Sequence, residues 1–162
     1  MTKVFVALGA NLAEPVSQLN RACEALLSLA APGSFAVSPY YASKPMGEVV
    51  QPDYVNAVAS FDTELAPLAL LDALQAIESQ QGRERLVRWG ARTLDLDLLL
   101  YGDMVMDSER LTLPHYGMKA RSFVLIPLAD LDPGLILPCN TAVSDLITAS
   151  MRDELQPLAS ED

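Results

Sequence analysis

The sequence has few cysteines, and its apolar stretches are short. Two cysteines, Cys23 and Cys139, cannot form a disulfide framework or a zinc site by themselves. No apolar stretch reaches the length of a membrane span, and the apolar N-terminal run is interrupted at Gly9 before a signal segment could form. We therefore expect a cytoplasmic protein that does not interact with membranes.

Basic residues are also scarce. The chain of 162 residues has 11 lysines and arginines against 21 aspartates and glutamates, which gives a formal net charge of −10. This balance argues against nucleic acid as the main partner, because phosphate backbones select basic surfaces. An arginine-rich segment therefore stands out and predicts a small anionic ligand; its members are Arg83, Arg85, Arg88 and Arg92.

The common nucleotide-binding and hydrolase motifs are missing. The chain has no Gly-x-x-x-x-Gly-Lys-Ser/Thr loop, no Gly-x-Gly-x-x-Gly sequence and no nucleophile elbow. If it binds ATP, side chains and metal must therefore replace the backbone cradle of a P-loop. Its length and its apolar content of 51% predict a single folded domain over residues 1–162.

Hydrophobic periodicity predicts an α+β fold. The predicted order is β-α-β-β-α-β, the split arrangement of ferredoxin-like folds, with an antiparallel sheet and its helices on one face. Residues 80–93 are expected to form a charged loop, and the C-terminal part a less regular extension with a short edge segment at 111–116. The predicted strands are 4–8, 35–43, 54–63 and 94–101; the helices begin at Pro15 and Pro67, with short ones at 121–131 and 142–150.

Asp95 and Asp97 lie one residue apart within the predicted strand 94–101. Residues i and i+2 of a strand point to the same side, about 7 Å apart. A buried core does not tolerate two unpaired like charges, so divalent cations are the simplest way to reconcile them. Hard oxygen ligands close to arginines predict a site for a magnesium-bound polyphosphate.

Both features also have plainer interpretations. The two acids could lie on a solvated sheet face, although the flanking leucines make the strand look central rather than edge-like. The arginines could form a charged surface loop. For Arg85 or Arg88 taken alone, this interpretation is as good as a role in binding. His115, the only histidine, could be structural or could bind a ligand from a stiff loop, and the sequence leaves this open.

The segment 88–98, Arg-Trp-Gly-Ala-Arg-Thr-Leu-Asp-Leu-Asp-Leu, closely resembles the signature of the 6-hydroxymethyl-7,8-dihydropterin pyrophosphokinase family. Five more stretches resemble the family in the same order, and together they extend the resemblance over roughly residues 3–150. These stretches are 8–12, 51–58, 78–83, 113–116 and 121–128.

The resemblance implies a role for each matching residue. Asp95 and Asp97 would bind two Mg²⁺ ions, and Arg83 and Arg92 would act as catalytic residues that stabilise the transferring pyrophosphoryl group. The implied ATP-binding residues are Arg85, Trp89, Arg110, Thr112, His115, Tyr116 and Arg121. The implied pterin-binding residues are Ser43, Pro45, Met46, Gly47, Tyr54, Asn56, Trp89 and Phe123, with Tyr54 and Phe123 stacking on either side of the ring.

The activity that the resemblance implies is transfer of the pyrophosphoryl group of ATP to 6-hydroxymethyl-7,8-dihydropterin, with release of AMP, in folate biosynthesis. The partners would be these two small molecules, and we expect a monomer. One alternative is a non-catalytic ferredoxin-like module that senses a nucleotide. Another is an ordinary kinase that transfers only the γ-phosphate.

Overall fold

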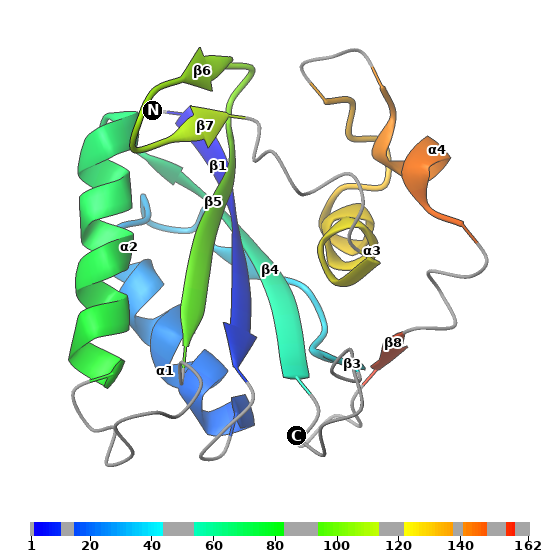
Figure 1. Cartoon of the computed structure of the whole chain (residues 1–162), viewed down its shortest axis with the longest axis horizontal. Coiled ribbons are helices and arrows are strands. Elements are labelled where there is room, and N and C mark those ends of the chain that lie inside the picture. The colour runs from blue at the N-terminus through cyan, green and yellow to red at the C-terminus, as the bar shows by residue number, and fades with distance from the viewer. Residues whose placement is uncertain are drawn as a thin grey trace.

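The computed structural model describes residues 2–10, 15–43, 54–82, 94–113, 122–137, 141–148 and 155–157. Within them, six strands form one antiparallel sheet (Figure 1). The strand order is β5-β1-β4-β3-β8, and β2 pairs beside β3 on the same edge of β4. The bounds are β1 (Thr2–Ala10), β2 (Ala36–Val37), β3 (Tyr41–Ser43), β4 (Tyr54–Thr63), β5 (Asp95–Tyr101) and β8 (Leu155–Pro157).

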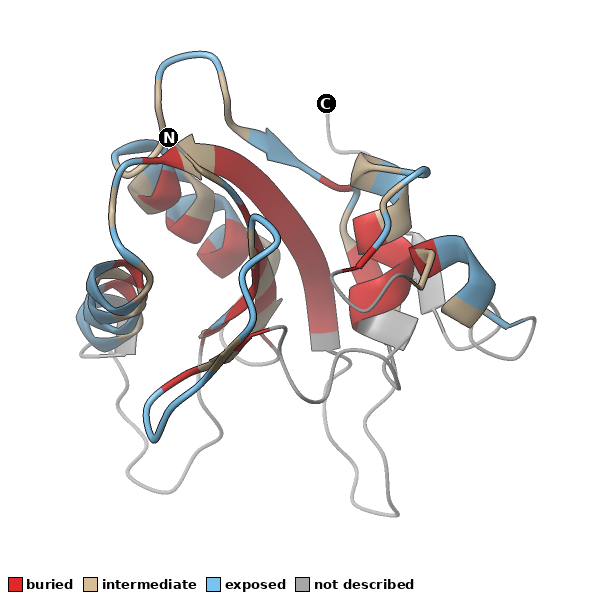
Figure 2. Ribbon diagram, turned by 90° about the horizontal axis from the view of Figure 1, so that it is seen from above, coloured by how far each residue is buried: buried red, intermediate tan, exposed pale blue. Residues whose placement is uncertain are grey.

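Helices cover both faces of this sheet. The long helices α1 (Pro15–Leu27) and α2 (Pro67–Gly82) lie on one face, as the ferredoxin-like prediction requires. The opposite face is covered by α3 (Ser122–Leu131) and by the short α4 (Val143–Leu146), which belong to the extension that follows the predicted β-α-β-β-α-β core. Figure 2 shows buried residues along the sheet between these two layers. The α+β class and the antiparallel sheet are confirmed.

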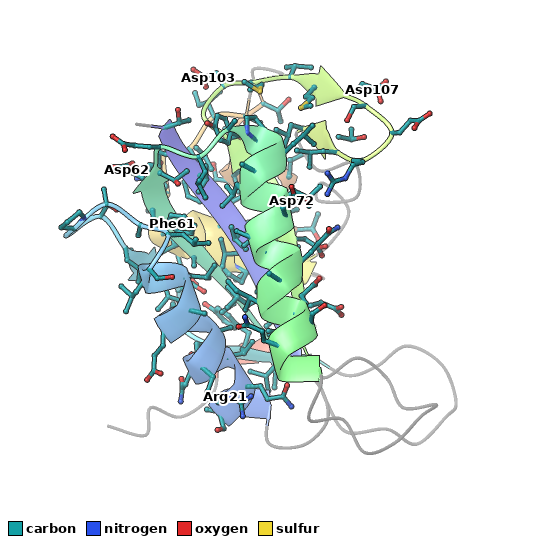
Figure 3. All side chains as sticks on the ribbon, turned by 90° about the vertical axis from the view of Figure 1, so that its left-hand side faces the viewer. Arg21, Phe61, Asp62, Asp72, Asp103 and Asp107 are labelled. Atoms are coloured by element: carbon teal, nitrogen blue, oxygen red, sulfur yellow. The ribbon has the colours of Figure 1, made fainter. Side chains whose placement is uncertain are left out.

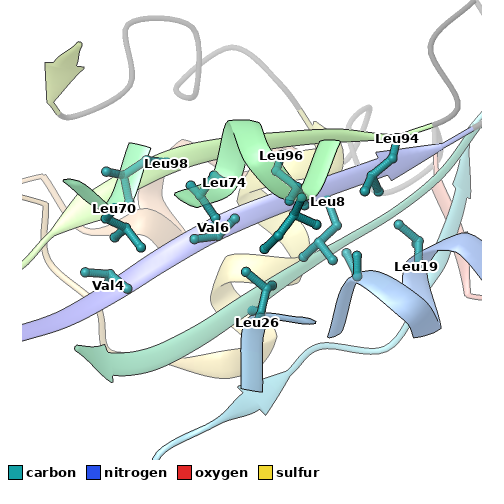
Figure 4. Packing of buried hydrophobic residues seen from close by; sticks show 14 of the residues in the cluster. Val4, Val6, Leu8, Leu19, Leu26, Leu70, Leu74, Leu94, Leu96 and Leu98 are labelled. Atoms are coloured by element: carbon teal, nitrogen blue, oxygen red, sulfur yellow. The ribbon is translucent and has the colours of Figure 1, made fainter. Parts of the chain in front are cut away.

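The alternation of side chains along β1 explains why both faces need a cover. Val4, Val6 and Leu8 are buried against α1 and α2 (Figure 4), whereas Phe5 belongs to the cluster that contains α3. Because successive strand residues point to opposite faces, an apolar residue at nearly every position means a strand buried on both sides. The sheet is therefore the middle layer of three, and β1 is an interior strand between β5 and β4.

The predicted strand 35–43 consists of two short strands with a bulge between them. Val37 pairs with Ala59 and Tyr41 pairs with Asn56, so three residues of this segment oppose two of β4. Pro39 has no N–H to continue the ladder. At the bulge, the Val58 N–H donates instead to a side chain, the Ser38 Oγ, at 3.0 Å. The extra residue also determines which side chain stands beside Asn56.

Other boundaries differ from the prediction. Helix α2 continues to Gly82, past the expected loop start at residue 80. Of the expected segment 111–116, β7 (Thr112–Leu113) pairs with β6 (Met106–Asp107) in a separate two-stranded sheet, while 114–116 lie outside the described residues. Strand β8 was not predicted at all. In the part of the chain that the structure describes, no helix has the length and apolar character needed to span a membrane.

We expect Ser38→Ala to lower the free energy of unfolding by about 1–3 kcal/mol, because it leaves the buried Val58 N–H without its acceptor. Urea denaturation measures the change. The matched control is Ser28→Ala, which removes an exposed hydroxyl and should stay within about 0.5 kcal/mol of the parent chain. Equal midpoints for the two variants would contradict this account of the bulge.

Candidate functional site

Four residues from four adjacent strands form one row across the sheet. Asp95 of β5 pairs with Gly9 of β1, Gly9 pairs with Asn56 of β4, and Asn56 pairs with Tyr41 of β3. Directly paired residues of antiparallel strands share a face of the sheet. The Tyr41 side chain packs against Ile126 of α3, so this row lies on the α3 side. The fold thereby gathers polar groups that are far apart in the sequence.

Asp97 lies on the same face as Asp95, two residues further along β5. Its cross-strand partner is Ala7. Asp95 is half-buried and Asp97 is exposed, while Leu94, Leu96 and Leu98 point into the core beneath α2. The two carboxylates therefore project together at the β5 end of the polar row, and the three alternating leucines anchor the strand from the other side.

Gly9 makes room for the Asn56 side chain. A Cβ atom at Gly9 would lie 3.0 Å from Asn56 Oδ1, closer than atoms of that kind normally approach. The Asn56 amide therefore extends over the β1 backbone, in the direction of β5. The side chain of Asn56 is only 6% exposed. A glycine within a strand is a known signal for such a close approach, but the sequence prediction ended the strand at Gly9 and assigned it no role.

Strand β5 is an edge strand of the main sheet, so the expectation that it is central is wrong. Its leucines are buried nevertheless, because α2 covers one face of the strand and the β6–β7 hairpin lies against it. At the open edge, the Leu96 N–H donates to Glu78 Oε2 of α2 at 2.8 Å. Glu78 thus holds the backbone between the two aspartates, a role that sequence reasoning did not assign.

A cavity of about 240 Å³ opens beside Asp97. Apolar side chains from α2, β5 and the turn before β7 form part of its wall, and Arg110 and Thr112 lie in its lining. Arg110 forms an ion pair with Asp72 on the outer face of α2 (Figure 3), and its Nη2 lies 3.4 Å from Gln75 Oε1. Two residues expected to bind ATP therefore lie in one hollow with an expected metal ligand.

The remaining expected site residues are described in part or not at all. Ser43 and Tyr54 are paired at the ends of β3 and β4, and Phe123 is in the first turn of α3, but only their backbone positions are described. The following lie outside the described residues: Pro45, Met46, Gly47, Arg83, Arg85, Trp89, Arg92, His115, Tyr116 and Arg121.

Asp95 and Asp97 suit a magnesium ion that takes part of its ligands from a bound phosphate. They do not suit a metal ion that is held by protein side chains alone. Among the residues that the structure describes, no group of three or more histidine, cysteine or acidic side chains could hold a metal ion. Mg²⁺ commonly takes one or two carboxylates and completes its octahedron with water and phosphate oxygens. The pair Asp95 and Asp97 fits that pattern, provided that a phosphate-bearing ligand supplies the other oxygens.

Two titratable groups with raised pKa values lie on the other side of the sheet. Burial raises the pKa of the Cys23 thiol, and burial together with the nearby thiol raises the pKa of Tyr40. The Tyr40 hydroxyl donates to Asn20 Oδ1 at 2.6 Å on the α1 side. Both groups are neutral at pH 7, so Cys23 is a poor nucleophile and the pair serves packing.

Comparison with known proteins identifies close relatives. The family model "7,8-dihydro-6-hydroxymethylpterin-pyrophosphokinase (HPPK)" matches residues 5–133. The chain is 56% identical over 147 residues to a 2-amino-4-hydroxy-6-hydroxymethyldihydropteridine pyrophosphokinase of Pseudomonas aeruginosa, with 91% of each chain covered. A protein of the same description from Haemophilus influenzae is 51% identical over 147 residues, covering 91% of this chain and 92% of the relative.

Solved structures agree with the fold. An HPPK-DHPS protein crystallised with substrates superposes with a TM-score of 0.73 at 11% identity, covering 96% of this chain and 46% of that one. HPPK-DHPS of Plasmodium falciparum gives a TM-score of 0.71 at 11% identity, covering 97% and 47%. This chain thus spans about half the length of those proteins, and at such identity the likeness concerns the fold alone.

We expect Glu78→Ala to lower the free energy of unfolding by about 1–3 kcal/mol, because the Leu96 N–H loses its carboxylate acceptor. Glu78→Gln keeps an acceptor oxygen and should lose less. The control Glu109→Ala removes an exposed glutamate and should be close to neutral. Chemical denaturation compares the three variants, and a Glu78→Ala midpoint equal to that of Glu109→Ala would refute the anchoring role.

Proposed function

Because the chain belongs to the 7,8-dihydro-6-hydroxymethylpterin-pyrophosphokinase family and is a pyrophosphokinase of folate biosynthesis, we propose how its own residues handle ATP and 6-hydroxymethyl-7,8-dihydropterin. The proposal rests on one observation, that Asp95 and Asp97 stand on one face of β5 and that Asp97 also borders a cavity. A nucleotide in that cavity has its phosphates beside the acids, and a pterin beside Asn56 has its hydroxymethyl group on the same face.

The cavity is the proposed site for the nucleotide base. Pockets for drug-sized ligands are commonly about 300–1,000 Å³, so a hollow of about 240 Å³ suits one ring system rather than a whole nucleotide. Leu71, Leu98 and Leu111 offer apolar contact to a purine. Thr112 and Arg110 supply polar groups at the same place, and Arg110 is free to exchange its exposed partner Asp72 for a ligand group at small cost.

Asp95 and Asp97 are the proposed ligands of two Mg²⁺ ions that accompany the triphosphate. Bound magnesium supplies charge neutralisation at the phosphate oxygens. Leu96, held by Glu78 at the strand edge and buried beneath α2, keeps the two carboxylates at neighbouring positions on one face. Arg83 and Arg92 are proposed to stabilise the charge that develops as the phosphate bridge breaks.

Asn56 is the proposed recognition group for the pterin edge. A side-chain amide can donate and accept at once, which matches the adjacent donors and acceptors of a pterin ring. Its burial and its position over Gly9 limit its rotation, so little freedom is lost on binding. Tyr54 and Phe123 are proposed to stack on the two faces of the ring, with Ser43, Pro45, Met46, Gly47 and Trp89 completing this part of the site.

The proposed reaction is attack of the hydroxymethyl oxygen on the β-phosphorus. The bond between that phosphorus and the oxygen bridging to the α-phosphorus breaks, and AMP leaves with the bonding electrons. The hydroxyl proton passes to solvent or to phosphate. The chain acts by positioning and by charge stabilisation. Arg85, His115, Tyr116 and Arg121, with Trp89, are proposed to contact the ATP. All these groups belong to one chain, so we further propose that it acts as a monomer. A cytoplasmic location stays a separate proposal.

Identification of the nucleotide product tests the proposed reaction. The chain is incubated with Mg-ATP and 6-hydroxymethyl-7,8-dihydropterin, and the products are separated by chromatography. We expect AMP and the pterin diphosphate in equal amounts. Formation of ADP would point to a γ-phosphate kinase instead, and absence of any product would point to a nucleotide sensor.

We expect Asp97→Ala to lower kcat at least about 1,000-fold, or roughly 4 kcal/mol, because a proposed metal ligand is lost. The side chain is exposed, so the free energy of unfolding should change little. The control is Asp107→Ala, which removes an exposed acid from β6 and should keep the parent rate. AMP formation and thermal unfolding are measured together, and a near-normal rate in Asp97→Ala would rule out the metal assignment.

A further inference from the structure

One polar contact joins the sheet to the helix layer on the site face. The Tyr41 hydroxyl of β3 donates to a carboxylate oxygen of Asp130 on α3. The ring of Tyr41 is 9% exposed and packs against Ile126 of α3 and Ile147. The contact therefore combines a directional hydrogen bond with an apolar support from the same helix.

This contact links the strand and the helix from which the proposed pterin site is built. Tyr41 stands beside Asn56 in the polar row and two residues before Ser43 on the same short strand. Ile126 and Asp130 are three and seven residues after Phe123, a spacing that places all three positions on one stripe of a helix. A single side chain of β3 thus contacts the stripe of α3 that begins at Phe123.

Among the described residues, apolar side chains of α3 also pack on the sheet. Leu125 and Leu128 pack with Val58 and Leu99 in one buried cluster. Hydrophobic contacts are non-directional and define the angle of a helix on a sheet only loosely. A tyrosine hydroxyl that donates to a carboxylate requires a defined distance and direction. Asp130 lies about 10 Å along the helix from Phe123, so a tilt of α3 at Asp130 would displace its first turn.

We propose that Tyr41 and Asp130 are positioning residues for the dihydropterin. This inference rests on the proposed function, in which a flat ring binds between Tyr54 and Phe123. The hydrogen bond between Tyr41 and Asp130 sets the distance between α3 and the β3–β4 end of the sheet, and this distance must fit the ring. Neither residue touches the substrate. They act through the spacing between α3 and the β3–β4 end of the sheet. The nucleotide cavity beside β5 is on the far side of β1 and does not depend on them.

The neighbouring tyrosine provides a matched control. Tyr41→Phe removes a hydroxyl that donates to Asp130 on the α3 side, and Tyr40→Phe removes a hydroxyl that donates to Asn20 on the α1 side. Each variant removes one tyrosine hydroxyl, and the two positions are adjacent in the chain. A purely structural role would lower stability in both and leave substrate affinity alone, whereas a positioning role changes pterin affinity in Tyr41→Phe only.

The measurements are KM for the dihydropterin, kcat for AMP formation, and the Kd of a non-hydrolysable ATP analogue. In Tyr41→Phe we expect KM for the dihydropterin to rise roughly three- to tenfold, the range that one such hydrogen bond can supply. The Kd of the nucleotide analogue should stay within about twofold of the parent value, a shift below the energy of a single hydrogen bond. In Tyr40→Phe both constants should match the parent chain.

Variants of the acceptor test the same bond from the other side. Asp130→Ala should reproduce the effect of Tyr41→Phe, and Asp130→Asn, which keeps an acceptor oxygen, should restore much of the pterin affinity. In the double variant Tyr41→Phe, Asp130→Ala, KM for the dihydropterin should rise no more than in either single variant, since the two changes remove the same interaction. Thermal unfolding of each variant shows that the domain is folded during the assay.

The outcomes separate this inference from the proposed function. If the parent chain forms AMP but Tyr41→Phe and Asp130→Ala keep the parent KM for the dihydropterin, the positioning role is overturned and the function stands. A parallel loss of nucleotide affinity would also overturn it, because the effect would then be a general loosening of the domain. Failure of the parent chain to form AMP would refute the proposed function itself.

Discussion

Strand β1 hydrogen-bonds to β4 on one side and to β5 on the other, and this double antiparallel register decides which side chains meet. A slip of one residue against β5 would turn Asp95 and Asp97 into the core and bring Leu96 to the site face. The alternation along β5 opposes that slip, since Leu94, Leu96 and Leu98 are buried beneath α2 while the aspartates lie on the other face. The placement of the acids therefore depends on backbone pairing that is enforced by hydrophobic burial.

The two faces of the sheet have different tasks. On the α1 and α2 side, leucines and valines form a continuous core, and beside it the Tyr40 hydroxyl contacts Asn20 and Cys23. On the α3 side, apolar packing gives way to Asn56, Asp95 and Asp97 towards the end of the sheet where β5 begins. The apolar layer thus supports the face of the sheet that carries these polar groups.

Much of this arrangement could be predicted from the sequence, and the rest could not for physical reasons. Period-two alternation was sufficient to place Asp95 and Asp97 on one face. The edge position of β5 was missed because α2 and the hairpin bury its leucines as fully as neighbouring strands would. The contact of Tyr41 with Asp130 spans 89 residues and leaves no local pattern. Strand β8 could not be recognised from propensity alone, because it has only three residues and one of them is Pro157.

The pairing of Val4 with Tyr101 has a consequence for how the chain folds. Strand β1 lies inside the sheet, yet one of its two neighbours is almost a hundred residues further along the chain. Closing so long a loop is slow compared with forming a local hairpin. Until β5 pairs with it, one edge of β1 exposes unpaired backbone groups, and this edge is where mispairing with another strand can begin.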